Sequence, residues 1–143
     1  MCGIVGILAK SQISEGHKVL LKKMADVLVH RGPDGEGFYF DQSIGLAHRR
    51  LSIIDLEGGK QPLSNEDGTI WVTFNGEIYN YLELREQLIQ KGHQFLTSSD
   101  TEVIVHLYEE KGEEFVTDLR GMFAIGLWDA RHKRLLLTRD RLG

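Results

Sequence analysis

The only cysteine of the 143-residue chain, Cys2, directly follows Met1 in the sequence MCGIVGI. With no second cysteine, Cys2 cannot form an internal disulfide. A cysteine thiol is only slightly ionised at neutral pH, so a nucleophilic cysteine needs a base close by. Removal of Met1 would give Cys2 a free α-amine, whose ordinary pKa of about 7.7 to 8.0 suits a general base near neutrality. Cys2 is therefore a candidate nucleophile, although its position also fits the first apolar residue of a strand.

The segment FNGEIYN, residues 74–80, holds a second set of groups that could act in catalysis. An Asn-Gly pair after an alternating strand is typical of a hairpin turn. The same pair offers two hydrogen-bond donors, the side-chain amide of Asn75 and the backbone N–H of Gly76, that could stabilise an oxyanion. The pair by itself does not decide between these interpretations.

The six histidines give no comparable signal. None has a spacing that indicates a partner for Cys2, and none has the spacing of a metal site. We therefore expect surface or core histidines, and no bound metal.

The composition and length restrict the class of protein. The chain is 41% hydrophobic and 27% charged, which is typical of a globular protein, and 143 residues suit one domain. A net charge of −4, with basic residues spread along the chain, argues against nucleic acid as the main partner. No apolar run approaches the roughly 20 residues that span a bilayer, and no secretion signal is visible. A single cysteine without an export signal predicts a cytoplasmic location.

These residues must be positioned by a mixture of strands and helices. Apolar side chains at helical spacing predict a helix over 14–29, and polar residues that resemble helix starts predict two more, one after Asn80 and one from Asp100 to Glu110. Alternation and apolar runs predict strands at 3–9, 37–41, 44–48, 50–55, 69–74, 121–130 and 134–140, with loops at 30–37 and 57–68. Short connections between strands favour an α+β protein with antiparallel sheet and helices outside it.

Five motifs together resemble one enzyme family: MCGIVGI, HRGPDGEG, AHRRLSIIDL, NGEIYN and SSDTEV. They resemble the class II glutamine amidotransferases, whose nucleophile is an N-terminal cysteine, and within that class the glutaminase domain of glutamine-dependent asparagine synthetase. The resemblance extends over residues 1–143. It implies an αββα sandwich of two antiparallel sheets of the N-terminal nucleophile (Ntn) hydrolase type, truncated at its C-terminal end. It also implies an ATP-dependent synthetase domain that this chain does not contain.

The resemblance assigns roles to particular residues. Cys2 corresponds to the nucleophile that attacks the glutamine side-chain amide, which gives a γ-glutamyl thioester and ammonia, and Asn75 with Gly76 corresponds to the oxyanion hole. Arg50 corresponds to the residue that binds the substrate α-carboxylate, and Asp100 to the carboxylate that receives the substrate ammonium. Less direct roles are implied for Glu77 in the same pocket, for the Ile53 segment that lines the glutamine site, and for Arg31 and Asp34 as a brace near Cys2.

Simpler interpretations of these residues stay open. Arg50 could be a surface arginine, Glu77 could be solvated, and Asp100 could cap a helix with or without binding substrate. Arg31 and Asp34 could only shape their loop. Neighbouring residues on a strand alternate, so we expect Arg49 to point away from Arg50.

The resemblance also implies partners and cofactors. The expected partners are L-glutamine and a C-terminal synthetase domain, with no nucleic acid and no membrane, and a homo-oligomeric assembly is left open. The glutaminase domain needs no cofactor, whereas ATP and Mg²⁺ are implied only for the absent domain. Ammonia would serve an asparagine-synthetase-type amidation of aspartate. Two alternatives are the amidotransferase half of a different synthetase, and a catalytically silent fragment in which Met1 is retained.

Overall fold

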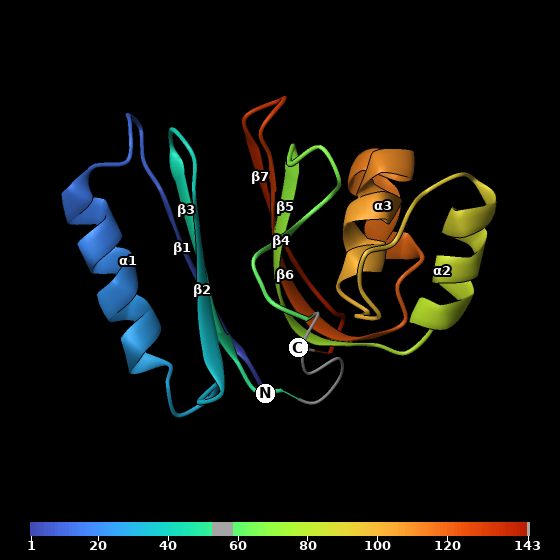
Figure 1. Ribbon diagram of the computed structural model, residues 1–143, viewed down its shortest axis with the longest axis horizontal. Coiled ribbons are helices and arrows are strands. Elements are labelled where there is room, and N and C mark those ends of the chain that lie inside the picture. Colours follow the sequence, from blue (N-terminus) through green and yellow to red (C-terminus); the bar gives the residue numbers. More distant parts are fainter. Residues whose placement is uncertain (53–58, 143) are drawn as a thin grey trace.

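Four layers of secondary structure are visible in the computed structural model (Figure 1), which describes residues 1–52 and 59–142. Helix α1 (Glu15–Val27) covers the outer face of a sheet of order β1-β3-β2, formed by Gly3–Leu8, Ile44–Arg50 and Gly35–Phe40. A second sheet has the order β4-β5-β6-β7, formed by Leu63–Ser64, Ile70–Ile78, Gly121–Asp129 and Arg134–Arg139. Its outer face is covered by α2 (Tyr81–Gln90), α3 (Glu102–Lys111) and the 3₁₀ helix η1 (Gly112–Thr117). All strand pairs in the described residues are antiparallel, which confirms the predicted αββα sandwich.

The alternation of side chains along the strands divides the core into three parts. Leu21 and Ala25 of α1 pack on Ala47 of β3. Ile44 and Leu46 of β3 project the other way, into the space between the sheets, where they meet Trp128 of β6. The largest cluster joins the second sheet to its helices, and its members include Val72, Phe74, Ile104, Leu107, Phe115 and Ile125. Because β3 is packed on both faces, it is a buried run rather than a half-exposed strand.

Several element boundaries differ from those predicted. β2 begins at Gly35, inside the segment predicted as a loop, and β4 and η1 were not predicted. The predicted strand at 50–55 is wrong at Leu51 and Ser52, which lie beyond the end of β3. The backbone N–H groups there are used elsewhere, since Leu51 donates to the thiol of Cys2 and Ser52 donates to Asp34. Residues 53–58 lie outside the described part of the chain.

The Asn75-Gly76 pair forms no turn, because β5 continues through it to Ile78. Asn75 is paired with Ala124 of β6 and Gly76 with Phe123. Gly76 has φ of 155°, and a Cβ atom there would lie 2.0 Å from the carbonyl oxygen of Met122. The glycine therefore permits a close backbone approach inside a strand, and the hairpin interpretation is wrong.

His48 forms a buried polar link between the two sheets. Its Nε2 lies 3.1 Å from the carbonyl oxygen of Phe74, to which a neutral imidazole donates. Burial, with a smaller contribution from the charge of Arg50, lowers the pKa of His48 from 6.5 to about 4, although the hydrogen bond to Phe74 opposes the shift. The imidazole is therefore neutral at physiological pH.

None of the helices in the described residues is long and apolar enough to span a bilayer.

We expect His48→Gln to reduce the acid sensitivity of folding. The unfolded chain takes up a proton at His48 below pH 6.5, whereas the folded protein does so only below about 4. Burial of neutral His48 therefore adds to the free energy of unfolding in full above pH 6.5. As the pH falls towards 4 the unfolded chain is favoured by its extra proton, and about 3 kcal/mol of stability is lost. Glutamine keeps an N–H donor for Phe74 but does not titrate. Urea unfolding of both proteins across this pH range measures the difference, and parallel pH profiles would contradict it.

Candidate active site

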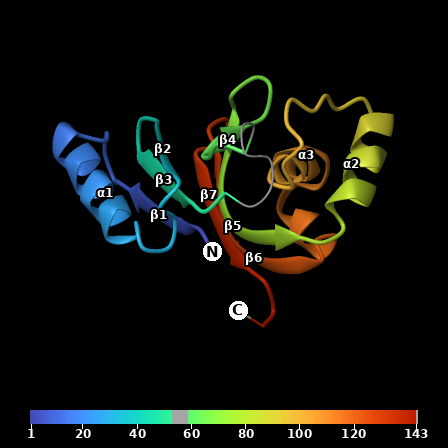
Figure 2. The same ribbon diagram turned by 60° about the horizontal axis from the view of Figure 1, so that its bottom comes forward.

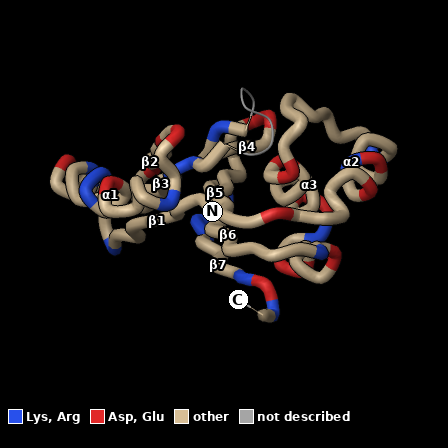
Figure 3. The backbone as a smooth tube through the Cα atoms, turned by 90° about the horizontal axis from the view of Figure 1, so that it is seen from below, with Lys and Arg blue, Asp and Glu red and all other residues tan. Residues whose placement is uncertain are grey.

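A pocket lies where the N-terminus meets the two sheets and the start of α3. Figure 2 shows the N-terminus between the sheets, next to β5 and β6, and Figure 3 shows it over the same strands from below. In that view acidic and basic residues are interspersed along the backbone. The pocket is lined by Met1, Cys2, His48, Arg50, Leu51, Gly59, Gln61, Phe74, Asn75, Gly76, Glu77, Ser99, Asp100, Thr101 and Met122. Most of the residues predicted from the sequence are therefore brought together.

Cys2 is positioned by the pairing of β1 with β3. Gly3 lies opposite Arg49, so Cys2 reaches the segment that follows Arg50. The Cys2 sulfur accepts a hydrogen bond from the Leu51 N–H at 3.4 Å and lies 3.7 Å from the Leu51 carbonyl oxygen. Arg31 donates from Nε to the carbonyl oxygen of Cys2 at 3.1 Å. Leu51 thus contacts the thiol, Arg31 holds the Cys2 backbone, and the partly buried side chain lines the pocket.

Arg31 and Asp34 both contact the backbone around the pocket, though at different points. Arg31 contacts Cys2 directly. The Asp34 carboxylate instead accepts from the Ser52 N–H at 2.8 Å, and the Asp34 N–H donates to the Arg50 carbonyl at 2.9 Å. Asp34 therefore shapes the exit from β3, which is the loop-shaping role that the sequence had left open.

The two neighbouring arginines of β3 point to opposite faces, as the alternation predicted. Arg49 donates from Nε to the Ala25 carbonyl at 3.2 Å and forms ion pairs with Asp26 and, at 2.8 Å, with Glu36. Arg50 lines the pocket. A guanidinium in a pocket is suited to bind a carboxylate through two parallel hydrogen bonds.

Asp100 supplies an acidic group to the same pocket. It is 5% exposed, and its Oδ2 accepts a hydrogen bond from the Ile78 N–H of β5 at 3.0 Å. Burial raises the pKa of Asp100, and the nearby charge of Glu77 adds to the shift, against hydrogen bonds from the backbone. A bound cation would favour the ionised form of this carboxyl.

The predicted helix-capping role of Asp100 is wrong. α3 begins at Glu102, its N-cap residue is Thr101, and the cap has no side-chain hydrogen bond. The carboxylate of Asp100 is directed at β5 instead. The preference of aspartate for helix starts is local, and here the contact with the sheet takes precedence.

Asn75 presents an unusual buried group. Its Oδ1 is buried and accepts no hydrogen bond from any residue of the described chain. An unsatisfied acceptor in the interior costs folding free energy. The other end of the same amide is the Nδ2 group, which is the donor that an oxyanion would need.

Gln61 lines the pocket although the sequence did not predict it as a site residue. Its Oε1 accepts from the Phe74 N–H at 2.6 Å, and its Nε2 donates to Thr101 Oγ1 at 3.3 Å. One side chain thus ties the strand before Asn75 to the residue after Asp100. Gln61 lies in a segment predicted only as a loop, and no local pattern marks it. Ile53, unlike Gln61, was predicted for the site, but it lies outside the described residues.

A family comparison agrees with this geometry. The profile of the glutamine amidotransferase domain matches residues 1–143. The chain belongs to the glutamine amidotransferase domain family. The match confirms the family resemblance read from the five motifs.

Relatives of this amidotransferase domain have about half of its residues in common. It is 53% identical over 145 residues to glutamine-hydrolyzing asparagine synthetase 2 of Bacillus subtilis (strain 168), with 100% of this chain and 19% of the relative covered. It is 51% identical over 143 residues to glutamine-hydrolyzing asparagine synthetase 3 of Arabidopsis thaliana, with 100% and 24% covered. The chain thus spans about a fifth to a quarter of the length of these curated relatives.

Solved structures show the same fold. The amidotransferase domain aligns with glutamine phosphoribosylpyrophosphate amidotransferase from B. subtilis, complexed with ADP and GMP, at a TM-score of 0.70 and 21% identity. The alignment covers 98% of this chain and 37% of that one. A second match, to an allosteric regulatory enzyme of purine biosynthesis, has a TM-score of 0.60 at 22% identity. These structural similarities support the αββα architecture of the chain.

Proposed function

We propose that this domain hydrolyses the side-chain amide of L-glutamine to glutamate and ammonia, with Cys2 as the nucleophile. The observation that carries the proposal is the shared pocket. It holds a thiol, a strand segment with two candidate oxyanion donors, an arginine and a buried aspartate. Arg50 and Asp100 provide the opposite charges that would hold the α-carboxylate and α-ammonium of an amino acid, and the thiol would meet its side chain.

The proposed reaction begins once Met1 has been removed, because Cys2 nitrogen is a non-basic amide while Met1 is attached. The free α-amine takes the thiol proton, and the sulfur attacks the amide carbon of glutamine. Asn75 Nδ2 and the Gly76 N–H stabilise the oxyanion that forms. The carbon–nitrogen bond breaks, the α-ammonium returns the proton to the leaving nitrogen, and ammonia departs. Water then hydrolyses the γ-glutamyl thioester to glutamate and regenerates the thiol.

Labelling with a glutamine-like electrophile, diazo-oxo-norleucine, tests the proposed function. Intact-mass analysis should show loss of methionine and a single adduct, which peptide mapping places on Cys2. Excess glutamine should protect the thiol from labelling. A processed protein that gives no adduct, or one labelled equally with and without glutamine, would contradict a glutamine-shaped site at Cys2.

We expect Arg50→Lys to raise KM for glutamine and to change kcat less. Lysine keeps the positive charge but cannot make the forked contact of a guanidinium with a carboxylate, which is a charge-assisted pair of hydrogen bonds. Steady-state glutaminase kinetics measure the effect. Arg49→Lys is the matched control, since Arg49 lies on the opposite face and binds Asp26 and Glu36. An Arg50→Lys enzyme with the KM of the control would rule out the carboxylate clamp.

We further propose that the ammonia serves the amidation of aspartate on a separate synthetase domain, which would use ATP and Mg²⁺. About 50% identity to proteins named glutamine-hydrolyzing asparagine synthetase supports this acceptor over that of a different synthetase. Transfer of ¹⁵N from amide-labelled glutamine into asparagine by the complete protein would test it, and labelled ammonia without labelled asparagine would contradict it. A cytoplasmic location stays a prediction.

A further inference from the structure

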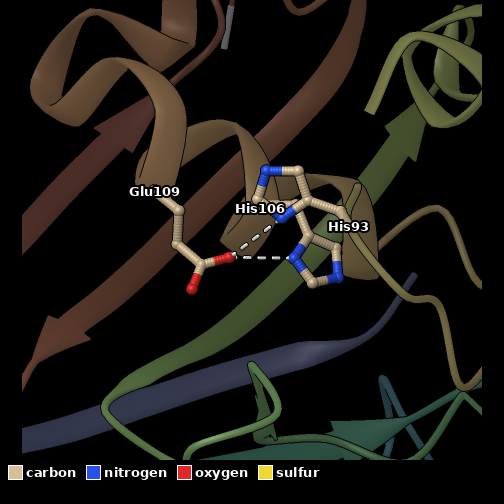
Figure 4. Close-up of side chains that lie close together, drawn as sticks. All are labelled: His93, His106 and Glu109. Carbon is tan, nitrogen blue, oxygen red and sulfur yellow. Dashed lines mark hydrogen bonds and ion pairs between the residues drawn. The ribbon is translucent and has the colours of Figure 1, made fainter. Parts of the chain in front are cut away.

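Two histidines and a glutamate converge on one side of α3 (Figure 4). None of them lines the active-site pocket. His106 and Glu109 lie three residues apart on the helix and therefore share a face, and His93 comes from the connection between α2 and α3. Glu109 Oε2 lies 2.9 Å from Nδ1 of His106 and 3.4 Å from Nδ1 of His93. The three candidate ligand atoms all lie within 4.8 Å of one another.

Two of the three side chains, Glu109 and His93, are oriented by hydrogen bonds outside the cluster. Glu109 Oε1 accepts from the Asn65 Nδ2 group at 2.7 Å, which leaves Oε2 facing both rings. His93 Nε2 lies 3.0 Å from a carboxylate oxygen of Glu110, so a proton on Nε2 leaves the Nδ1 lone pair directed at the cluster. A carboxylate behind an imidazole is the usual outer support of a metal-binding histidine.

His106 is the buried member of the cluster, with 1% exposure. Its Nε2 has no hydrogen-bond partner among the described residues, and the closest acidic atom, Glu102 Oε1, lies 3.9 Å away. A proton on Nε2 would face the Glu102 carboxylate, and the Nδ1 lone pair would then be available to a cation in place of the present contact with Glu109. Glu66 adds a fourth group, since its Oε2 lies 4.0 Å from His106 Nδ1.

We propose that His93, His106 and Glu109 form a site for a divalent transition-metal ion of the Zn²⁺ class, with Glu66 in the fourth position. Two imidazole nitrogens and carboxylate oxygens are ligands that Zn²⁺ accepts, whereas Mg²⁺ and Ca²⁺ prefer oxygen alone. Tetrahedral Zn²⁺ at about 2.0 to 2.2 Å from its ligands places them about 3.3 Å apart, close to the distances between Glu109 Oε2 and the two rings.

The ion would join three segments that the chain otherwise connects through hydrogen bonds. It would link α3 to the α2–α3 connection through His93 and to the β4–β5 turn through Glu66, where Asn65 already binds Glu109. The proposed ion has a structural role, because none of its ligands lines the pocket of Cys2. Loss of the ion would leave the hydrogen bonds and weaken the packing of these segments.

Zinc binding by the purified protein, after treatment with a chelator, tests the proposal. Titration against a chromophoric chelator should show one Zn²⁺ per chain. His93→Ala, chosen because His93 lies outside the helices, should weaken binding by more than the roughly 10- to 100-fold typical of losing an outer support. His132→Ala is the matched control, because His132 also contacts a carboxylate, Asp129, at 2.7 Å but lies outside the cluster. It should bind Zn²⁺ as the parent does.

Co²⁺ substitution gives a readout of the ligands. The parent protein should show the visible absorption of tetrahedral Co²⁺, and Glu66→Gln should change that spectrum. A parent protein that binds no stoichiometric Zn²⁺, or a His93→Ala variant that binds as tightly as the control, would overturn the proposal and leave a hydrogen-bonded network. Glutamine hydrolysis by His93→Ala should be unchanged in either case, so failure here is distinct from failure of the proposed function.

Discussion

Cys2→Ala should abolish glutamine hydrolysis and leave the domain folded. The change removes the only thiol of the chain, and with it the atom that would form the thioester. The cost to folding should be small, because Cys2 is only partly buried and, among the described residues, its sulfur makes only long contacts with the Leu51 backbone, at 3.4 Å to the N–H and 3.7 Å to the carbonyl oxygen. Glutaminase activity measures the loss, and thermal unfolding confirms that the variant is folded. Turnover retained in a folded Cys2→Ala protein would remove Cys2 from the mechanism.

An N-terminal extension tests the role of the α-amine independently of the role of the thiol. A short tag ahead of Cys2 keeps the side chain and converts the α-amine into an amide. If the α-amine is the base, the tagged protein should be about as inactive as Cys2→Ala while its thiol can still be alkylated. A fully active tagged protein would mean that another group accepts the thiol proton.

The parts of this site that the sequence predicted correctly depend on local periodicity. The opposite directions of Arg49 and Arg50 follow from the alternation of a strand, and the ion pairs of Arg49 with Asp26 and Glu36 confirm them. The apolar spacing of residues 14–29 likewise predicted α1. The two-sheet sandwich itself needed the family resemblance, because short connections predict antiparallel sheet but not its division into two layers.

The features that the sequence did not show depend on contacts between distant segments. Asn-Gly favours a turn, yet pairing of β5 with Met122 and Phe123 keeps the chain extended through Gly76. Gln61 reaches Phe74 and Thr101, which no spacing in the chain connects. The histidine cluster is similar, since His106 and Glu109 share a helical face but His93 joins them only after α2 and α3 pack.

Asn75→Ala should lower glutamine turnover by roughly 100- to 1000-fold without destabilising the fold. The two effects are expected together because the amide serves the reaction at a cost to folding. Asn75 Oδ1 is buried without a partner in the described residues, and removal of an unsatisfied acceptor is close to neutral or stabilising. If turnover were lost because the variant unfolds, the midpoint of unfolding would be lower than that of the parent protein.

Asn80→Ala is the matched control for this prediction, because it removes the same amide from a structural position. Asn80 Nδ2 donates to the Asp118 carbonyl at 2.9 Å, and its Oδ1 accepts from the Arg120 N–H at 2.9 Å. This variant should lose stability and keep its kcat, which is the reverse of the result for Asn75→Ala. Steady-state kinetics and urea unfolding of both variants measure the contrast. An Asn75→Ala protein with near-normal kcat would place the oxyanion donors elsewhere in the pocket.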